Sequence, residues 1–508
     1  MKLGVRILFT LLLISAVCVP GAQGQGVRND AQADSPPRPF LSLCRMPELQ
    51  SKAWCGRYEV FEDRVSKRGR KIALNMIILP ASAEKPAPDP VFFFAGGPGQ
   101  SAASLAGLLG EGPLAKIREQ RDLVFLDQRG TGESNPLTCN LYSDDNDLRG
   151  YFEDMFPVRE VRACRERLEK VADLKQYTTS SAIDDLDDVR RALGYEKINL
   201  YGGSYGTTVA LAYLRQYGKH VRSVILAGVA PTDLKLPLPF AKGAQYAIDH
   251  LIDDCAADTA CRAAFPNLRA EFTSVLDRLA KKPASIGLIN PLTQKTQRVQ
   301  LGRGVFAERL RMMLYDRGPA SMVPLLIHRA YQGDFGPFIL AALPQARGIY
   351  QSLSLGMYFT VTCSENVPFI TEEDVKRETK GTFLGDYRVR VHQGACREWP
   401  RARVPRQFTS AVESDASVLL LSGEVDPASP HWLGVEVARH LPNSLQATIP
   451  YGGHGYFSDC ISGITAEFIS KGSAKGLNTS CLQSVRRPPF ITTLPEALSA
   501  SQSIATCN

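Results

Sequence analysis

The stretch Gly202-Gly203-Ser204-Tyr205-Gly206 follows the apolar run 198–201 and precedes an apolar segment that begins at Val209. The run reads as a short buried strand, and residues 207–217 read as a helix with alanine and leucine on its inner side. Small residues around a serine permit a sharp turn from strand to helix, which exposes the hydroxyl to a base and to a backbone N–H of the helix N-terminus. The pattern predicts a nucleophile at Ser204.

Length, composition and charge describe a globular protein. A chain of 508 residues with 44% hydrophobic residues is long enough to bury a large core. Its formal net charge is +7, and part of that charge lies in a segment that we expect to be removed. Basic runs and aromatic residues interleaved with basic ones are missing from the sequence, so we expect no nucleic-acid partner.

The N-terminus has the layout of a secretory signal peptide. Lys2 and Arg6 precede the apolar run 7–19, and Ala22-Gln23-Gly24 follows it. The apolar run is short for a membrane span. A lipid-modified Cys18 is the alternative, but Val17 is bulkier than the residue that normally precedes such a cysteine. We expect cleavage near Gly24 and a secreted or periplasmic protein that is free of the membrane afterwards.

The cysteines agree with export. Twelve are present, eleven of them after residue 24, and neither they nor the histidines have the spacing of a zinc site. Disulfides are therefore favoured, and neither a metal nor a cofactor is expected. Sequence neighbours suggest five pairs and leave Cys507 over. The pairs are Cys44 with Cys55, Cys139 with Cys164, Cys255 with Cys261, Cys363 with Cys396, and Cys460 with Cys481.

Strand and helix patterns predict the fold class. Residues 58–65 and 71–79 alternate in polarity like an edge hairpin. Six short apolar runs read as strands buried on both sides of a parallel sheet, and helical patterns such as 183–193 lie between them. The runs are residues 91–94, 123–126, 198–201, 224–227, 418–421 and 446–449. We therefore predict an α/β protein whose mostly parallel central sheet has helices on both faces.

The regular spacing of predicted strands is interrupted between Pro231 and about Pro405. Four helical patterns fill this part of the chain, which we interpret as a mainly helical cap over residues 232–405 that is inserted into the sheet. The patterns cover residues 240–257, 268–281, 304–315 and 322–331. The predicted organisation is a signal peptide (1–24), a first core segment (25–231), the cap (232–405) and a second core segment (406–508).

A nucleophilic serine needs a base and an acid, which follow it in the order acid, then histidine, in the α/β-hydrolase fold. Of seven histidines, His454 lies just after the last predicted strand, in a glycine-rich loop. Asp426 follows the strand 418–421 and precedes Pro427, which fixes a turn. Glu424 is the competing acid, and Asp426 is preferred because it lies further beyond the strand. We predict the triad Ser204, Asp426 and His454.

A second motif supplies the expected oxyanion hole. Phe92-Phe93-Phe94 leads into Ala95-Gly96-Gly97-Pro98-Gly99, whose glycines allow a backbone N–H to approach a substrate. We assign the backbone N–H groups of Gly97 and Tyr205 to the hole. A phosphate-binding interpretation is weak because the Gly-x-x-x-x-Gly-Lys pattern is absent from this loop.

Together these motifs resemble the tripeptidyl aminopeptidase and prolyl iminopeptidase group of secreted α/β-hydrolases. The resemblance rests on Gly96-Gly97-Pro98-Gly99, on Asp127-Gln128-Arg129-Gly130-Thr131-Gly132-Glu133-Ser134, on the serine motif and on Asp426 and His454. It implies release of short pieces from peptide N-termini, and residues 406–508 then correspond to the TAP-like C-terminal region. Small prolyl iminopeptidases have histidine where this chain has Ala95. With the long cap, this points to the larger tripeptidyl branch.

Roles can be predicted for three further charged residues. Asp127 and Arg129 are expected to brace the neighbouring glycine loop rather than to take part in the reaction. An aminopeptidase must also bind a protonated amine, which calls for a carboxylate in a restricted pocket. Glu365, two residues after Cys363, resembles the acidic position after a cysteine in this family. A surface glutamate beside a disulfide is the alternative interpretation.

The sequence thus predicts a secreted serine exopeptidase that acts on peptides through an acyl-enzyme on Ser204. An esterase or amidase with the same triad and a small non-peptide substrate is one alternative. A catalytically silent binding protein on a hydrolase scaffold is another, and it is disfavoured because every triad position is filled. The sequence specifies neither the oligomeric state nor the number of residues released.

Overall fold

The computed structural model describes residues 38–45, 52–141, 146–455, 457–495 and 498. All of them belong to the compact unit Pro37–Asn508. The expected signal peptide at 1–24 and the remaining cysteine, Cys507, lie outside the described residues. Within the described part, no helix combines the length and apolar character that a membrane span requires.

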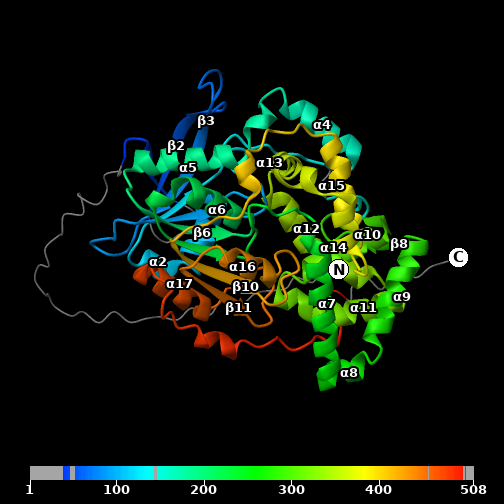
Figure 1. The fold of residues 1–508 in the computed structure, drawn as a ribbon. Coiled ribbons are helices and arrows are strands. Elements are labelled where there is room, and N and C mark those ends of the chain that lie inside the picture. The colour runs from blue at the N-terminus through cyan, green and yellow to red at the C-terminus, as the bar shows by residue number, and fades with distance from the viewer. Residues whose placement is uncertain (1–37, 46–51, 142–145, 456, 496–497, 499–508) are drawn as a thin grey trace, which may run out of the picture. The chain divides into compact units, whose positions relative to one another are not determined.

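A nine-stranded sheet forms the centre of this unit (Figure 1). The strand order is β1-β2-β3-β5-β4-β6-β7-β10-β11. Pairing is antiparallel from β1 through β3 to β5 and parallel from β5 to β11. The strands are β1 (Leu41–Cys44), β2 (Ala53–Phe61), β3 (Lys71–Leu79), β4 (Val91–Phe94), β5 (Leu123–Leu126), β6 (Ile198–Gly203), β7 (Val221–Ala227), β10 (Ser417–Gly423) and β11 (Ser444–Ile449). The predicted mostly parallel sheet is confirmed.

The antiparallel edge of the sheet differs from the prediction in two respects. The predicted strand 58–65 is in fact β2, which begins at Ala53 and ends at Phe61, before the turn at residues 62–66. The edge strand β1 was not predicted, because four residues with two exposed side chains carry little periodic signal. Its pairing with β2 is fixed by the disulfide Cys44–Cys55.

The central strands are buried on both sides because helices cover both faces of the sheet. Phe92 and Phe94 of β4 pack in one core cluster with α5, α6 and α16. Phe93, between them, packs in another with α1, α2 and α17. These helices are α1 (Ala106–Gly110), α2 (Ala115–Arg118), α5 (Thr179–Leu193), α6 (Tyr205–Tyr217), α16 (His431–Ala438) and α17 (Asp459–Lys471). Period-two alternation of side chains along β4 thus separates the two cores.

The chain between β7 and β10 is mostly helical, and it also contains an antiparallel pair of strands that the sequence pattern did not predict. This pair, β8 (Ala284–Ile289) and β9 (Thr296–Leu301), joins α9 to α10. The segment has its own large hydrophobic core. Its helices are α7 (Pro239–Ala257), α8 (Thr259–Ala264), α9 (Leu268–Lys281), α10 (Arg303–Met313), α11 (Arg317–Tyr331), α12 (Gly336–Ser352), α13 (Leu355–Val361), α14 (Glu372–Thr379) and α15 (Tyr387–Arg397).

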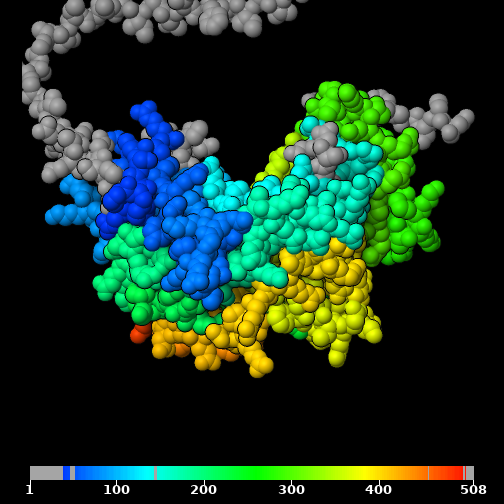
Figure 2. All heavy atoms as spheres, turned by 90° about the horizontal axis from the view of Figure 1, so that it is seen from above, coloured from blue at the N-terminus to red at the C-terminus, as the bar shows by residue number. Residues whose placement is uncertain are grey.

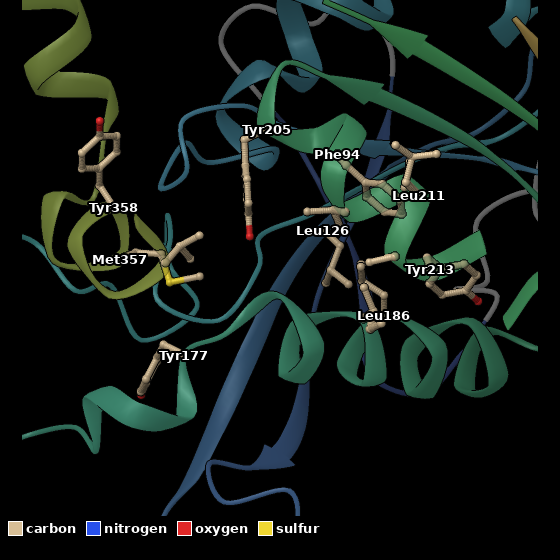
Figure 3. Packing of buried hydrophobic residues seen from close by; sticks show 14 of the residues in the cluster. Phe94, Leu126, Tyr177, Leu186, Tyr205, Leu211, Tyr213, Met357 and Tyr358 are labelled. Atoms are coloured by element: carbon tan, nitrogen blue, oxygen red, sulfur yellow. The ribbon is translucent and has the colours of Figure 1, made fainter. Parts of the chain in front are cut away.

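Polar and apolar contacts both join this inserted segment to the first part of the chain. Arg162 of α4 (Val158–Leu168) binds Glu398, just after α15, through two hydrogen bonds of 2.8 and 3.0 Å. Figure 2 shows the two segments, teal and yellow, against each other on one face. Met357 and Tyr358 of α13 enter the same buried cluster as Leu186 of α5 (Figure 3). The insertion is therefore fixed to the sheet-covering helices and shares their core.

All five predicted disulfides are present. Their partners are Cys44–Cys55, Cys139–Cys164, Cys255–Cys261, Cys363–Cys396 and Cys460–Cys481. Five disulfides in one chain are typical of proteins outside the reducing cytoplasm. The pair Cys363–Cys396 also ties the segment that contains Glu365 to the end of α15.

Candidate active site

Ser204 occupies a strained turn at the carboxyl end of β6. Its backbone has φ 55° and ψ −124°, a region that non-glycine residues rarely adopt, and its N–H donates to the carbonyl of Ala227 over 2.8 Å. The neighbouring glycines are required by close backbone contacts. A Cβ on Gly202 would lie 2.4 Å from the carbonyl oxygen of Gly206, and one on Gly206 would lie 2.0 Å from that of Phe94. The turn therefore places Ser204 between the end of β6 and the start of α6.

His454 lies in the loop after β11, and its Nε2 is 3.0 Å from the Oγ of Ser204. Its backbone N–H donates to the carbonyl of Tyr315 over 2.9 Å, and the two rings lie 4.8 Å apart. A Cβ on Gly453 would come within 2.2 Å of the same carbonyl, so this approach needs glycine. Tyr315 directly follows α10 and belongs to the inserted segment. The insertion thus helps to position the histidine.

Asp426 contacts the other side of the imidazole. Its two carboxylate oxygens lie 2.9 and 3.1 Å from Nδ1 of His454. The backbone N–H groups of Ala428 and Ser429 donate to Oδ1 over 2.8 and 2.9 Å, and the Ser429 hydroxyl donates to Oδ2 over 2.9 Å. Burial opposes ionisation, but His454 and the backbone donors outweigh it and lower the pKa of Asp426. The carboxylate is therefore ionised at neutral pH.

The competing acid, Glu424, has another position. Its carboxylate accepts the backbone N–H of Tyr451 over 2.9 Å, and its own carbonyl lies 3.2 Å from Nδ1 of His431. These contacts hold the loop after β11 in place. The structure brings Asp426, and not Glu424, to the imidazole of His454.

The glycine loop after β4 lies directly beside the serine. A Cβ on Gly96 would contact the Cβ of Ser204 at 3.1 Å, and Gly97 has φ +107°. Gly97, Tyr205, Ser204 and His454 line one small cavity of about 70 Å³. Tyr205 is the first residue of α6, so its N–H is one of the unpaired donors of a helix N-terminus. Both predicted oxyanion donors therefore adjoin the hydroxyl that would attack.

Asp127 and Arg129 both have structural contacts, but only Asp127 contacts residues next to the glycine loop. Asp127 accepts hydrogen bonds from the hydroxyl of Ser101 over 2.7 Å and from the backbone N–H of Ala103 over 3.0 Å, directly after the glycine loop. Arg129 is fully buried and binds Asp185 through two hydrogen bonds of 2.7 and 2.8 Å. The contacts of Asp127 brace the glycine loop. Arg129 instead joins Asp185 of α5 to the backbone carbonyls at the end of β2, so it does not brace that loop as expected.

Glu365 is buried, not on the surface. It lies in a π-helical segment, Thr362–Asn366, and lines the same small cavity as Ser204 and His454. Its oxygens accept the backbone N–H and the hydroxyl of Thr179 over 2.7 and 2.6 Å. Burial raises its pKa to about 7, against the opposing effect of the Thr179 hydrogen bonds. Glu365 is thus a carboxylic acid with a pKa of about 7 that lines the same cavity as Ser204.

The site includes residues that the sequence analysis missed. Tyr315 and Thr179 come from distant parts of the chain and carry no motif, so no local signal identifies them. Ser429 follows Asp426 by three residues in a proline turn, which is the spacing at which an aspartate accepts backbone and hydroxyl donors. That signal was present in the sequence.

A larger cavity of about 460 Å³ opens on the other side of the serine, and its lining is mostly apolar. Leu105, Leu108 and Phe457 line one part of it, and α10 and α15 contribute charged side chains to another. Ser204 thus lines both cavities, which together offer space for a ligand around its hydroxyl.

Comparisons with known proteins agree with this geometry. Residues 89–299 match the family described as alpha/beta hydrolase fold, and residues 382–481 match the family described as TAP-like protein. Serine protease Hip1 of Mycobacterium tuberculosis is 26% identical over 86% of this chain and 90% of its own length. Carboxylesterase B of the same organism is 25% identical over 84% and 86%. Proline iminopeptidase of Neisseria gonorrhoeae is 28% identical over 28% and 32%.

The first family match extends into the insertion as far as β9, and the second begins before α15, so α10 to α14 lie between them. The sheet order and the strained serine turn agree with the first match. The chain therefore has the α/β-hydrolase fold and is a serine hydrolase of that type, with a match to a TAP-like family over residues 382–481.

Proposed function

We propose that this protein is a serine exopeptidase that releases short pieces from the N-termini of peptides outside the cytoplasm. The observation that carries the proposal is the buried carboxylate of Glu365 in the small cavity that Ser204 and His454 also line. A charged amine is the group that such a carboxylate would bind. The TAP-like match and the similarity to a protein named serine protease support the peptidase assignment.

The proposed reaction follows from the contacts of the triad. The Oγ of Ser204 attacks the peptide carbonyl while Nε2 of His454 takes its proton. His454 then gives that proton to the leaving amine, and a water molecule hydrolyses the acyl-enzyme by the same route in reverse. Asp426 holds the imidazole in the tautomer with hydrogen on Nδ1 and stabilises the imidazolium. The N–H groups of Gly97 and Tyr205 would bind the oxyanion.

Glu365 would restrict the reaction to substrates with a free N-terminus. An ionised carboxylate attracts the protonated α-amine, whereas an acetylated N-terminus would leave it buried without a charged partner. Each Glu365 oxygen accepts one hydrogen bond from Thr179 and retains a second acceptor position for the amine.

An esterase is the second candidate, and two observations favour it. The larger cavity is lined mainly by apolar side chains, and a relative named carboxylesterase B covers most of the chain. The same triad hydrolyses esters and amides alike, so specificity must come from the groups around it.

The deciding experiment compares free and acetylated forms of one tripeptide 4-nitroanilide, with a simple 4-nitrophenyl ester beside them. We expect cleavage of the free-amine peptide, slow or no cleavage of its acetylated form, and loss of the difference in Glu365→Gln. Glu372→Gln is the matched control, because that glutamate is exposed on α14 and pairs with Arg390. Activity restricted to the ester would support the esterase instead.

A further inference from the structure

A buried group of four charged side chains lines the larger cavity on the side of the insertion. Glu308, Arg309 and Arg311 come from α10, and Arg388 comes from α15. Each is at most 8% exposed. Three arginines accompany one glutamate, and no other Asp, Glu, Lys or Arg among the described residues lines this cavity. Among these four side chains, positive charges outnumber negative ones.

The single glutamate is paired with one of the arginines. Arg311 donates to both oxygens of Glu308, over 2.9 and 2.6 Å. Burial opposes the charge of Glu308, but Arg311 and Arg388 outweigh it and lower its pKa to about 2. The glutamate is thus ionised, and its charge is matched by that of Arg311.

Neither Arg309 nor Arg388 donates a hydrogen bond to Glu308, although Arg388 forms a longer ion pair with it. Arg309 donates to the carbonyl of Tyr151 over 2.8 and 2.6 Å. Arg388 contacts the sulfur of Met155 and lies 3.7 Å from Glu308, beyond hydrogen-bond distance. The Nε of Arg388 is buried and has no hydrogen-bond partner. Arg388 therefore keeps donor capacity that the protein itself leaves unused.

The arginine group is linked to the catalytic histidine through Tyr315. Nη1 of Arg311 donates to the hydroxyl of Tyr315 over 2.8 Å, and the ring of Tyr315 packs on His454. Phe240 supports both arginines, since its ring lies 4.1 Å from the guanidinium carbon of Arg311 and 5.5 Å from that of Arg388. Ser204 and Arg388 also line the same cavity, so one substrate bound there can contact both residues.

We propose that Arg388, with Arg311 beside it, forms a subsite for a carboxylate of the substrate. Buried charges in proteins are normally paired, and the guanidinium fork matches the geometry of a carboxylate. The inference rests on the proposed peptidase function for the identity of the substrate. It assigns that substrate a negative group in the larger cavity, whereas Glu365 would bind its amine in the smaller one.

Two parts of a peptide present this chemistry: an acidic side chain and the C-terminal carboxylate. Two matched pairs of substrates distinguish them. One pair is a free-amine peptide with Glu or Gln at each position in turn, and the other is a short peptide with a free C-terminal carboxylate or its amide. Each pair changes the charge and leaves the size of the substrate nearly the same.

The experiment measures kcat/KM for both pairs with the wild type, Arg388→Gln and Arg390→Gln. Arg390 is the matched control, since it is exposed on the same helix and pairs with Glu372 and Asp386. We expect the wild type to prefer the carboxylate member of at least one pair by about tenfold or more. Arg388→Gln should remove that preference, and Arg390→Gln should keep it. Equal losses on both members in Arg388→Gln would show a structural role and overturn the proposal.

A second measurement separates this proposal from the peptidase assignment. Glutarate and its uncharged diamide are compared as inhibitors of 4-nitrophenyl acetate hydrolysis, which requires only the serine and its base. The wild type should bind glutarate about tenfold more tightly than the diamide, and Arg388→Gln should bind both alike. If peptides are not cleaved but glutarate is preferred, the peptidase proposal fails and the subsite stands. If the wild type binds both compounds equally, the subsite proposal is wrong.

Discussion

The backbone N–H of His454 donates to the carbonyl of Tyr315 over 2.9 Å, so a residue of the inserted segment holds the histidine that contacts Ser204. The aromatic ring of Tyr315 also packs on the imidazole, with 4.8 Å between the ring centres. The insertion is therefore part of the catalytic geometry, in addition to covering the site.

Removal of the Tyr315 ring should disturb this geometry. In Tyr315→Ala the imidazole loses its packing partner, and we expect kcat to fall by about two orders of magnitude, the usual cost of a misplaced catalytic group. Tyr315→Phe keeps the ring and should lose much less. The measurement is kcat on one chromogenic substrate for the three proteins. Equal activity of Tyr315→Ala and Tyr315→Phe would show that the ring does not position His454.

Asp426 and Ser429 both contact Nδ1 of His454, and their substitution should reduce kcat to different extents. Asp426→Asn offers an amide in place of the carboxylate and disfavours the required tautomer, so kcat should fall by about four orders of magnitude. Ser429→Ala removes one donor to Asp426 and should cost about tenfold. Steady-state kinetics of both variants provide the measurement, with thermal unfolding to show that each is folded. A larger loss for Ser429→Ala than for Asp426→Asn would contradict these roles.

Glu365 predicts a pH dependence for amine binding. Its pKa is raised to about 7 because it is buried, so the group is ionised above that pH and neutral below it. The KM of a free-amine peptide should rise as the pH falls from about 8 to about 6, and the KM of an acetylated ester should stay level. Glu365→Gln should abolish the pH effect on the free-amine peptide. A rise that persists in Glu365→Gln must come from another group.

The disulfide between Cys363 and Cys396 should stabilise the part of the insertion that carries Glu365 and Arg388. It closes a loop with a sequence separation of 33 residues, for which chain entropy predicts about 3–4 kcal/mol of stability. The double variant Cys363→Ala/Cys396→Ala should therefore unfold at a lower urea concentration than the wild type. An unchanged urea midpoint would mean that the surrounding core alone fixes this segment.

The sequence predicted the central strands because buried parallel strands are short, continuous apolar runs. The predicted bounds 91–94 and 123–126 are those of β4 and β5. The same reasoning missed β1, which has only four residues, and the pair β8 and β9, in which buried and exposed side chains alternate. Strands of this kind do not form the continuous apolar runs on which the prediction of the central strands relied.

Some residues of the candidate site could also be predicted from the sequence, and others could not. Ser204, Asp426 and His454 lie in turns directly after strands, where glycine and proline mark the backbone geometry. Glu365 was predicted only from the family resemblance, because nothing in its local sequence indicates burial. Arg311 and Arg388 lie in ordinary helical patterns, and only packing between α10 and α15 brings them to one cavity. Turns can thus be predicted from the local sequence, whereas contacts between helices that are distant in the chain cannot.

The most direct test of the account is the cleavage of a free-amine tripeptide 4-nitroanilide by the wild type and by Ser204→Ala, each with the acetylated peptide as control. The account predicts that the wild type releases nitroaniline from the free-amine peptide, that acetylation suppresses this release, and that Ser204→Ala has no activity above background. Undiminished activity in Ser204→Ala would contradict the mechanism. Equal cleavage of the free and acetylated peptides by the wild type would contradict the exopeptidase assignment.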